Sequence, residues 1–276
     1  MSNESTRQYF FSREERRLLD EAPGLSGPVE VFESGYYRWM EFGNGVVQSA
    51  IDLRDHTQLV LPYTRWCLAA LPLIRLPRSL LVLGAGGGTL PRLAAHHGVR
   101  DIDMVDHDAT VLKAANRWFG LASANVRTLR ADARDFLLTC ERDYDAVICD
   151  LFTQDGMPAW VGQEAFFHIC ADALSNDGVA VFNLAPLLRD EFDGLYPLIQ
   201  TAFPNGTLQL HIPDTNNYIA FGFKSVPRHL DRRVLSRRAA KLGRCTKLPM
   251  VNYLNAIYAA NRSRQGRLSL SHQPPT

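Results

Sequence analysis

The stretch from Ser79 to Gly88, Ser-Leu-Leu-Val-Leu-Gly-Ala-Gly-Gly-Gly, constrains the fold of this chain more than any other. An apolar run of strand length leads directly into a loop in which four of five residues are glycine. The residues from Thr89 to His97 then have the pattern of a helix, which Gly98 ends. A buried strand, a glycine turn and a helix N-terminus open the βαβ unit that binds nucleotides. Because a tight structural turn has the same pattern, the loop alone leaves both interpretations open.

Four glycines of this loop are candidate cofactor-binding residues. Without side chains they let the backbone approach a ligand closely, and the free N–H groups at the helix start favour anionic or acceptor groups. These candidates are Gly84, Gly86, Gly87 and Gly88.

From Leu80 onward, strand-like and helix-like segments alternate along the chain, which predicts a parallel sheet with helices on both faces. The expected strands are 80–83, 102–105, 126–130, 146–149 and 179–183, and the expected helices are 89–97, 109–119, 133–140 and 162–174. Two further strands, 207–212 and 218–224, are joined by Pro-Asp-Thr-Asn-Asn, a link too short for a helical crossover. We therefore predict an α/β fold with a Rossmann-like seven-stranded sheet of five parallel strands plus an antiparallel pair. This arrangement resembles the class I S-adenosylmethionine-dependent transferases, whereas a dinucleotide dehydrogenase would continue with parallel units.

A small antiparallel β meander is expected ahead of the glycine loop. The turn dipeptides Ser34-Gly35 and Asn44-Gly45 separate three strand-like runs, 29–33, 36–42 and 46–51. Residues 1–27 read as an entry segment with one short helix, and 57–71 as a helix. We expect an N-terminal β-hairpin domain over 1–55, a nucleoside-binding catalytic domain over 56–262 and a mobile tail over 263–276.

Composition narrows the class of protein. The formal net charge of the 276 residues is +1, which favours neither nucleic acid nor anionic membrane as a partner. The five cysteines are scattered and odd in number, a pattern that favours reduced thiols in a cytoplasmic protein over disulfides or a metal site. No secretory signal or membrane span is expected. Nine Lys or Arg between Lys224 and Lys247 stand against one acid, and we interpret this region as a solvated helix face rather than a nucleic-acid surface.

Three aspartates stand at the ends of consecutive strands of the alternating pattern. Asp106 follows Gly84 by 22 residues, a spacing at which a carboxylate accepts ribose hydroxyls. Asp132 follows the third strand, where it would face an adenine, although it would also suit the N-cap of the next helix. Asp150 follows the fourth strand and would accept a proton from an attacking amine or stabilise its charge. Since ligands bind at the carboxyl ends of strands in open α/β sheets, we expect the three to line one crevice.

At these residues the sequence resembles the spermidine synthase (polyamine aminopropyltransferase) family, over roughly 33–184. Residues 45–49 (Gly-Val-Val-Gln-Ser) are similar to its hairpin, and 105–108 (Val-Asp-His-Asp) to its ribose-binding element. Residues 131–133 (Ala-Asp-Ala) resemble its adenine-binding motif, and 144–150 (Tyr-Asp-Ala-Val-Ile-Cys-Asp) the start of its catalytic loop. The resemblance implies a homodimer and roles for Gln48, Asp106, His107, Asp132 and Ala133 in cofactor binding and for Asp150 in catalysis. We expect no metal cofactor.

The sequence departs from the family where the family binds its amine substrates. The glycine loop lacks the acid that in the family holds the amino end of decarboxylated S-adenosylmethionine. Asp150 is followed by Leu-Phe-Thr, without the family's second acid, and 55–61 keep only the first acid of a polyamine-binding segment. Bare loop amides at a helix N-terminus would instead favour a carboxylate. We therefore expect S-adenosylmethionine as the donor, with methyl or aminocarboxypropyl transfer to a small-molecule acceptor such as an amine.

Two alternatives remain at this stage. One is aminopropyl transfer from decarboxylated S-adenosylmethionine, the activity that the family resemblance implies. The other is a nucleoside-binding regulatory protein without turnover, which a donor turnover assay would distinguish from an enzyme.

Overall fold

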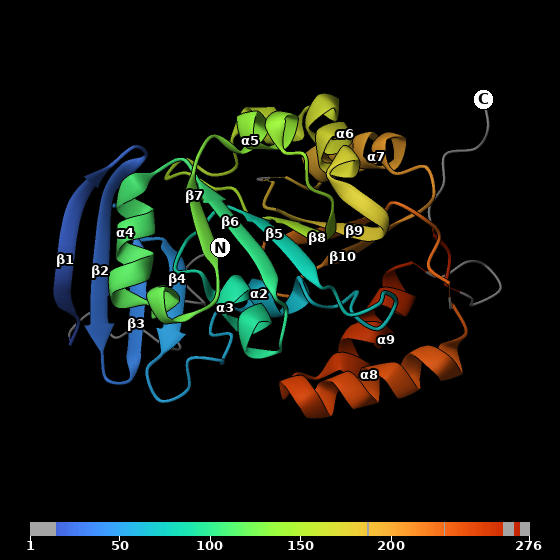
Figure 1. The fold of residues 1–276 in the computed structure, drawn as a ribbon, viewed down its shortest axis with the longest axis horizontal. Helices are drawn as coiled ribbons and strands as arrows, with labels where there is room; N and C mark the ends of the chain where they lie inside the picture. The colour runs from blue at the N-terminus through green and yellow to red at the C-terminus, as the bar shows by residue number, and fades with distance from the viewer. Residues whose placement is uncertain (1–14, 187, 229, 262–267, 271–276) are drawn as a thin grey trace.

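The computed structural model describes residues 15–186, 188–228, 230–261 and 268–270. Two sheets lie next to each other, a four-stranded antiparallel sheet at the N-terminal end and a seven-stranded sheet beyond it (Figure 1). The first sheet has the order β1-β2-β3-β4, formed by β1 (Arg17–Gly24), β2 (Gly27–Ser34), β3 (Tyr37–Glu41) and β4 (Val47–Asp52). The three expected strands of the meander correspond to β2, β3 and β4.

Strand β1 occupies a stretch for which we expected a short helix. It pairs with β2 from Arg17 opposite Glu33 to Gly24 opposite Gly27, so tertiary pairing prevails over the local pattern. The strand lies at the sheet edge, where charged side chains oppose further pairing. The part of the expected helix within residues 1–14 lies outside the described residues.

The second sheet confirms the predicted topology. Its order is β10-β11-β9-β8-β5-β6-β7; the strands from β5 to β9 are parallel, and β11 is antiparallel to both β9 and β10. The strands are β5 (Ser79–Leu83), β6 (Asp101–Asp106), β7 (Arg127–Arg130), β8 (Tyr144–Cys149), β9 (Leu174–Leu184), β10 (Thr207–His211) and β11 (Tyr218–Phe223). The predicted fold class is therefore correct.

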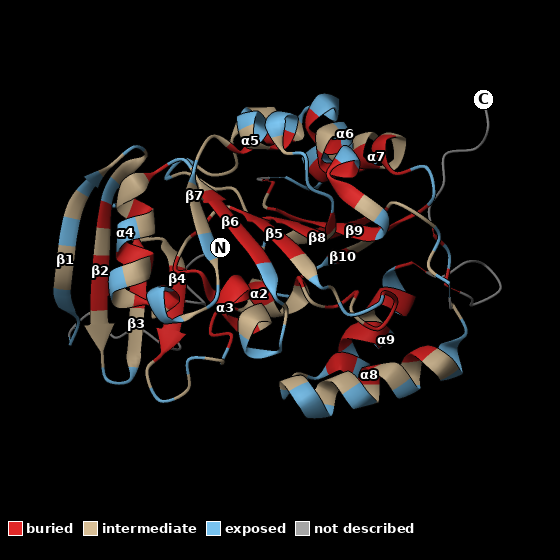
Figure 2. Ribbon diagram, in the orientation of Figure 1, coloured by how far each residue is buried: buried red, intermediate tan, exposed pale blue. Residues whose placement is uncertain are grey.

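Alternate residues of the central strands face two different cores. In β5, Leu80 and Val82 belong to one buried cluster, while Leu81 and Leu83 belong to the other. This period of two explains why the strand reads as a continuous apolar run, since both faces are covered by helices (Figure 2). One face carries α3 (Thr89–His96), α4 (Ala109–Trp118), α8 (Arg232–Thr246) and α9 (Met250–Ala260), and the other α5 (Ala133–Thr139), α6 (Glu164–Asp172) and α7 (Arg189–Ala202).

The expected helix over 57–71 is much shorter in the structure. Only α2 (Pro62–Trp66) is helical, with proline at its first position. Ahead of it, Asp55 accepts hydrogen bonds from the backbone N–H and the hydroxyl of Thr57, which hold an Asx turn instead of a helical one. This turn leads the chain into the site region.

Beyond α9, the described residues 268–270 pack against the fold, with Leu268 and Leu270 buried. The rest of the expected mobile tail lies outside the described residues. No helix among the described residues is long and apolar enough to span a membrane.

Candidate active site

The glycine loop between β5 and α3 brings two strand ends into contact. The backbone N–H of Asp150 donates to the carbonyl of Leu83, and the N–H of Gly84 donates to the carbonyl of Val105. A Cβ atom on Gly84, whose φ is +92°, would collide with the carbonyl oxygen of Asp150. Glycine at this position is therefore required for the chain after β5 to pass this close to the chain after β8 at the carboxyl edge of the sheet.

Asp106 ties the glycine loop to the end of β6. One carboxylate oxygen accepts from the N–H of Ala85 and the other from the N–H of Asp108, both at 2.8 Å. Burial raises the pKa of Asp106 above its ordinary value, despite these two donors. Each carboxylate oxygen has a further lone pair, so the side chain can still accept from two vicinal hydroxyls. The next acid, Asp108, caps α4 by accepting from the backbone N–H of Thr110.

Asp132 has the capping role that the sequence left open as an alternative. It accepts from the backbone N–H of Arg134 and forms a two-point ion pair with the guanidinium of the same residue, at 3.0 and 3.1 Å. The hydrogen bonds from Arg134 lower the pKa of Asp132. The guanidinium of Arg134 in turn lies 4.5 Å from the ring centroid of Trp160. The adenine-binding role of Asp132 stays a prediction, and Ala133 lies buried behind it at the start of α5.

Asp150 is a partly buried carboxylate held by side chains. The Nδ2 of Asn183 donates to its Oδ1 at 2.8 Å, and the hydroxyl of Tyr63 also hydrogen-bonds to it. The Tyr63 hydroxyl lies within 3.3 Å of the carbonyl of Gln48 as well. Burial raises the pKa of Asp150, against the lowering effect of both hydrogen bonds. A carboxylate of raised pKa is a better proton acceptor than an exposed one.

The hydrogen-bonded chain behind Asp150 extends one residue further. Asn217 donates from Nδ2 to the Oδ1 of Asn183 at 2.8 Å. An ionised Asp150 can only accept, so Asn183 must turn its NH₂ group toward it and offer its oxygen to Asn217. The two amides from β9 and the β10–β11 connection are thus fixed in one orientation.

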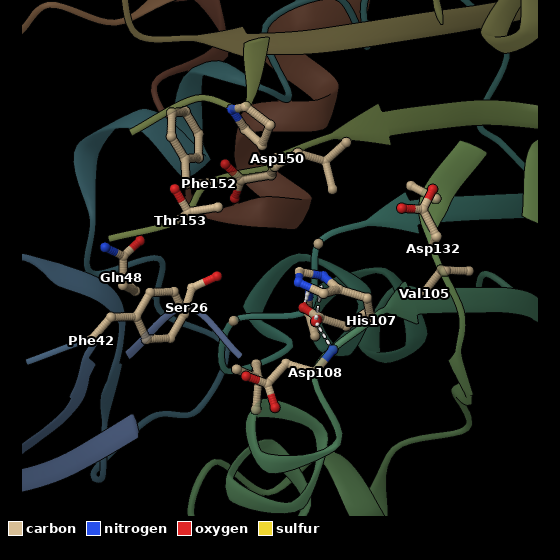
Figure 3. Close-up of a pocket in the computed structure, with 18 of the residues that line it drawn as sticks. Ser26, Phe42, Gln48, Val105, His107, Asp108, Asp132, Asp150, Phe152 and Thr153 are labelled. Atoms are coloured by element: carbon tan, nitrogen blue, oxygen red, sulfur yellow. Dashed lines mark hydrogen bonds and ion pairs between the residues drawn. The ribbon is translucent and has the colours of Figure 1, made fainter. Parts of the chain in front are cut away.

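Two cavities meet beside Asp150 at the carboxyl edge of the sheet. The donor cavity, as we call the first, is lined by the glycine loop and the ends of β6, β7 and β8; in Figure 3, Asp150 and Asp132 lie on different sides of it. The acceptor cavity, the second, lies between the β3–β4 turn, the loop after Asp150 and the β10–β11 turn. Both are lined by Gln48, Tyr63, Phe152 and Thr153.

Most of the expected site residues line the donor cavity together. They are Gln48, Gly84, Gly86, Asp106, His107, Asp132, Ala133 and Asp150. Gly87 and Gly88 are not among the residues that line it: a Cβ on Gly87 would meet the ring of Phe119 in the core, and Gly88 is the N-cap of α3. Their cofactor-binding role stays a prediction.

Sequence reasoning missed three residues of the site, Tyr63, Asn183 and Trp160. Asn183 had a visible signal, since it is an amide near the end of an otherwise apolar strand, and a buried amide needs partners. Tyr63 and Trp160 had no such signal in the sequence. Aromatic residues near proline are common in loops and helix starts, so they do not indicate a site. Among the described residues, no cluster of three or more His, Cys, Asp or Glu could hold a metal ion.

Known proteins resemble this chain over different parts of its length. Residues 64–186 match the model of the Spermine/spermidine synthase domain. The polyamine aminopropyltransferase of Chromobacterium violaceum is 25% identical over 256 residues, covering 92% of this chain and 98% of that protein. The eEF1A lysine and N-terminal methyltransferase of Mus musculus is 33% identical over 147 residues, which are 48% of this chain and 21% of that protein.

Solved structures show the same fold. A probable spermidine synthase from Corynebacterium glutamicum gives a TM-score of 0.67 at 18% identity, covering 93% of this chain and 97% of that one. Human methyltransferase-like protein 13 in complex with SAH gives a TM-score of 0.61 at 24% identity, over 68% of this chain and 93% of that one. The resemblance to the spermidine synthase family is confirmed.

Proposed function

We propose that this chain, which carries the spermine/spermidine synthase domain over residues 64–186, transfers an alkyl group from an adenosyl sulfonium donor to an amine acceptor. The observation that carries the proposal is the position of Asp150. Its partly buried carboxylate lines the donor cavity, and its partners Tyr63 and Asn183 line the acceptor cavity. A proton acceptor is therefore held where the contents of the two cavities would meet.

The donor cavity suits the nucleoside of such a donor. Asp106 lies beside the glycine loop with further lone pairs available, and Gly84 and Gly86 present backbone without side chains to the cavity. His107 and Asp132 add to the polar part of the lining, and Trp160 adds an aromatic ring. This set can hold two ribose hydroxyls and a planar base.

The donor supplies an electrophilic carbon that is bonded to a sulfonium sulfur. As the new N–C bond to the acceptor forms, the C–S bond breaks and its electron pair stays on sulfur. The amine must attack with its lone pair, and the product nitrogen then carries an extra proton. Asp150 accepts that proton, and Tyr63 and Asn183 hold the carboxylate toward the acceptor side. The two cavities also accelerate the reaction by holding the two reactants close together and aligned.

For the transferred group, we favour aminopropyl transfer from decarboxylated S-adenosylmethionine. Support comes from the relatives named polyamine aminopropyltransferase, which match along nearly the whole chain. Asp150 also supports it, since amine alkylation produces a proton that a partly buried carboxylate can take.

A second candidate, methyl or aminocarboxypropyl transfer from S-adenosylmethionine, is favoured by one observation. The glycine loop presents Gly86 to the donor cavity and contains no acid to hold a donor amine. Gly86 lies ahead of α3, whose N-terminus suits a carboxylate instead. The methyltransferase relative from mouse is consistent with this candidate.

Product analysis separates the candidates. The protein is incubated with each donor and 1,4-diaminobutane, and the nucleoside products are identified by mass. Formation of 5′-methylthioadenosine from the decarboxylated donor supports aminopropyl transfer, whereas S-adenosylhomocysteine from the carboxylated donor indicates methyl transfer. Donor binding without any nucleoside product, with simple amines as well, contradicts both and leaves a regulatory binding protein.

Gly86 offers a direct test of donor choice. Its φ is +45°, a conformation that Asp and Asn adopt more readily than other side chains, and a Cβ would make only ordinary contacts with Ser49. Gly86→Asp should shift relative affinity toward the decarboxylated donor by about tenfold compared with Gly86→Asn, on the scale of one charged hydrogen bond. An equal shift in both variants would show that the donor's amino-acid end lies elsewhere.

A further inference from the structure

The acceptor cavity differs from the donor cavity in its charge. Among its described lining residues, only Asp155 carries a charge, and Asp155 is exposed. The other polar side chains are neutral amides and hydroxyls: Asn44, Gln48, Tyr63, Thr153, Gln154, Asn183, Thr215, Asn216 and Asn217.

The partly buried carboxylate of Asp150 beside this cavity serves the reacting nitrogen. Asp150 carries one charge, and the reacting nitrogen, which becomes cationic as it is alkylated, needs it. The amides of Asn183 and Asn217 are oriented by Asp150 and have no net charge to balance a second cation. A second ammonium in the cavity would lose hydration and find only the exposed carboxylate of Asp155, whose attraction water screens, so the exchange is unfavourable.

An uncharged polar group has no such difficulty. The amides and hydroxyls of the lining both donate and accept hydrogen bonds, which suits a hydroxyl or an amide on the far end of the acceptor. The loop after Asp150 is itself held by neutral contacts: the hydroxyl of Thr153 donates to the carbonyl of Gly156, and Asn44 donates to the carbonyl of Gln154.

We infer that the acceptor is an amine with one reacting nitrogen and an uncharged polar remainder, and that the cavity selects against diamines. This inference rests on the proposed function, since it names the acceptor class of the same site. It concerns the far end of the acceptor and holds for either donor.

The test compares two acceptors of the same length, 1,4-diaminobutane and 4-aminobutan-1-ol, which differ only in a terminal ammonium or hydroxyl. With whichever donor is turned over, kcat/KM for the amino alcohol should exceed that for the diamine by about tenfold or more. Preference for the diamine would overturn the inference and leave the proposed transfer intact. If neither acceptor is turned over with either donor, the proposed function fails. The inference is then tested by measuring how tightly each amine binds to protein saturated with 5′-methylthioadenosine. Tighter binding of the amino alcohol supports it; tighter binding of the diamine, or binding of neither, overturns it.

Thr153 allows a converse test because it lines both cavities. In the wild type, the backbone N–H of Asp155 donates a hydrogen bond to the hydroxyl of Thr153. Thr153→Asp and Thr153→Asn both keep a side-chain oxygen that can accept this hydrogen bond. Only the Asp variant adds a carboxylate, so its ratio of diamine to amino alcohol kcat/KM should rise about tenfold over that of the Asn variant. Equal ratios in the two variants would show that charge in this cavity does not select the acceptor.

Discussion

Asp106 and Asp150 are both partly buried acids at the carboxyl edge of one sheet, yet the protein holds them in different ways. Asp106 is fixed by backbone N–H groups of the glycine loop and the turn after β6. Asp150 is fixed by the side chains of Asn183 and Tyr63. Backbone donors fix Asp106 as part of the loop architecture, which suits a binding role. Side-chain donors allow the proton affinity of Asp150 to be set by its neighbours, which suits chemistry.

The same contrast separates the two cavities. The donor cavity is built from strand ends and carries several acids, whereas the acceptor cavity is built from turns and carries mostly amides. Strand ends are positioned by the sheet, so the residues that line the donor cavity are fixed by the fold. Turns can change their side chains without disturbing the fold, so acceptor choice can vary within the same fold.

The largest expected effect comes from Asp150→Asn. The variant keeps the shape and the hydrogen bond from Asn183 but removes the proton acceptor, so turnover should fall by about 10²-fold or more. Donor affinity, measured by calorimetry, should stay within a few-fold of wild type. If Asp150→Asn turns over at the same rate as wild type, Asp150 takes no part in proton transfer.

A smaller effect is expected on stability for the same variant. Burial raises the pKa of Asp150 in the folded protein, so the ionised side chain destabilises the fold above that pKa. Below the unfolded pKa this penalty is absent, because the carboxyl is protonated in both states. We expect the Tm of Asp150→Asn to exceed that of wild type by a few degrees at pH 7 and the difference to shrink as the pH falls. A lower Tm for the variant at every pH would contradict this account.

The smallest effect is expected for Asp132→Ala. Loss of the N-cap of α5 should lower the free energy of unfolding by about 1 kcal/mol. If Asp132 also binds the base, donor affinity falls as well. Asp132→Asn serves as the control, because it can still cap the helix but loses most of the ion pair with Arg134. Chemical denaturation and calorimetry together separate the two roles.

The sequence predicted the sheet topology and most of the donor cavity, because these depend on local patterns. The glycine loop, the acids at successive strand ends and the short link before β11 each have a distinct signature. The acceptor cavity could not be predicted in the same way. It combines the β3–β4 turn, the start of α2 and the β10–β11 turn, whose meeting depends on tertiary packing. The same reason explains β1, which becomes a strand only by pairing with β2.

The different roles of Asp106 in donor binding and of Asp150 in proton transfer are tested most directly by calorimetric titration of 5′-methylthioadenosine into Asp106→Ala and Asp150→Asn. Asp106→Ala should weaken binding by about 1.5–3 kcal/mol, roughly tenfold to a hundredfold, as expected for lost hydrogen bonds to a charged group. Thermal melts establish that the variant is folded, since Asp106 also holds the glycine loop. Asp150→Asn should bind within a few-fold of wild type. Unchanged affinity in Asp106→Ala, or a larger loss in Asp150→Asn, would contradict the account.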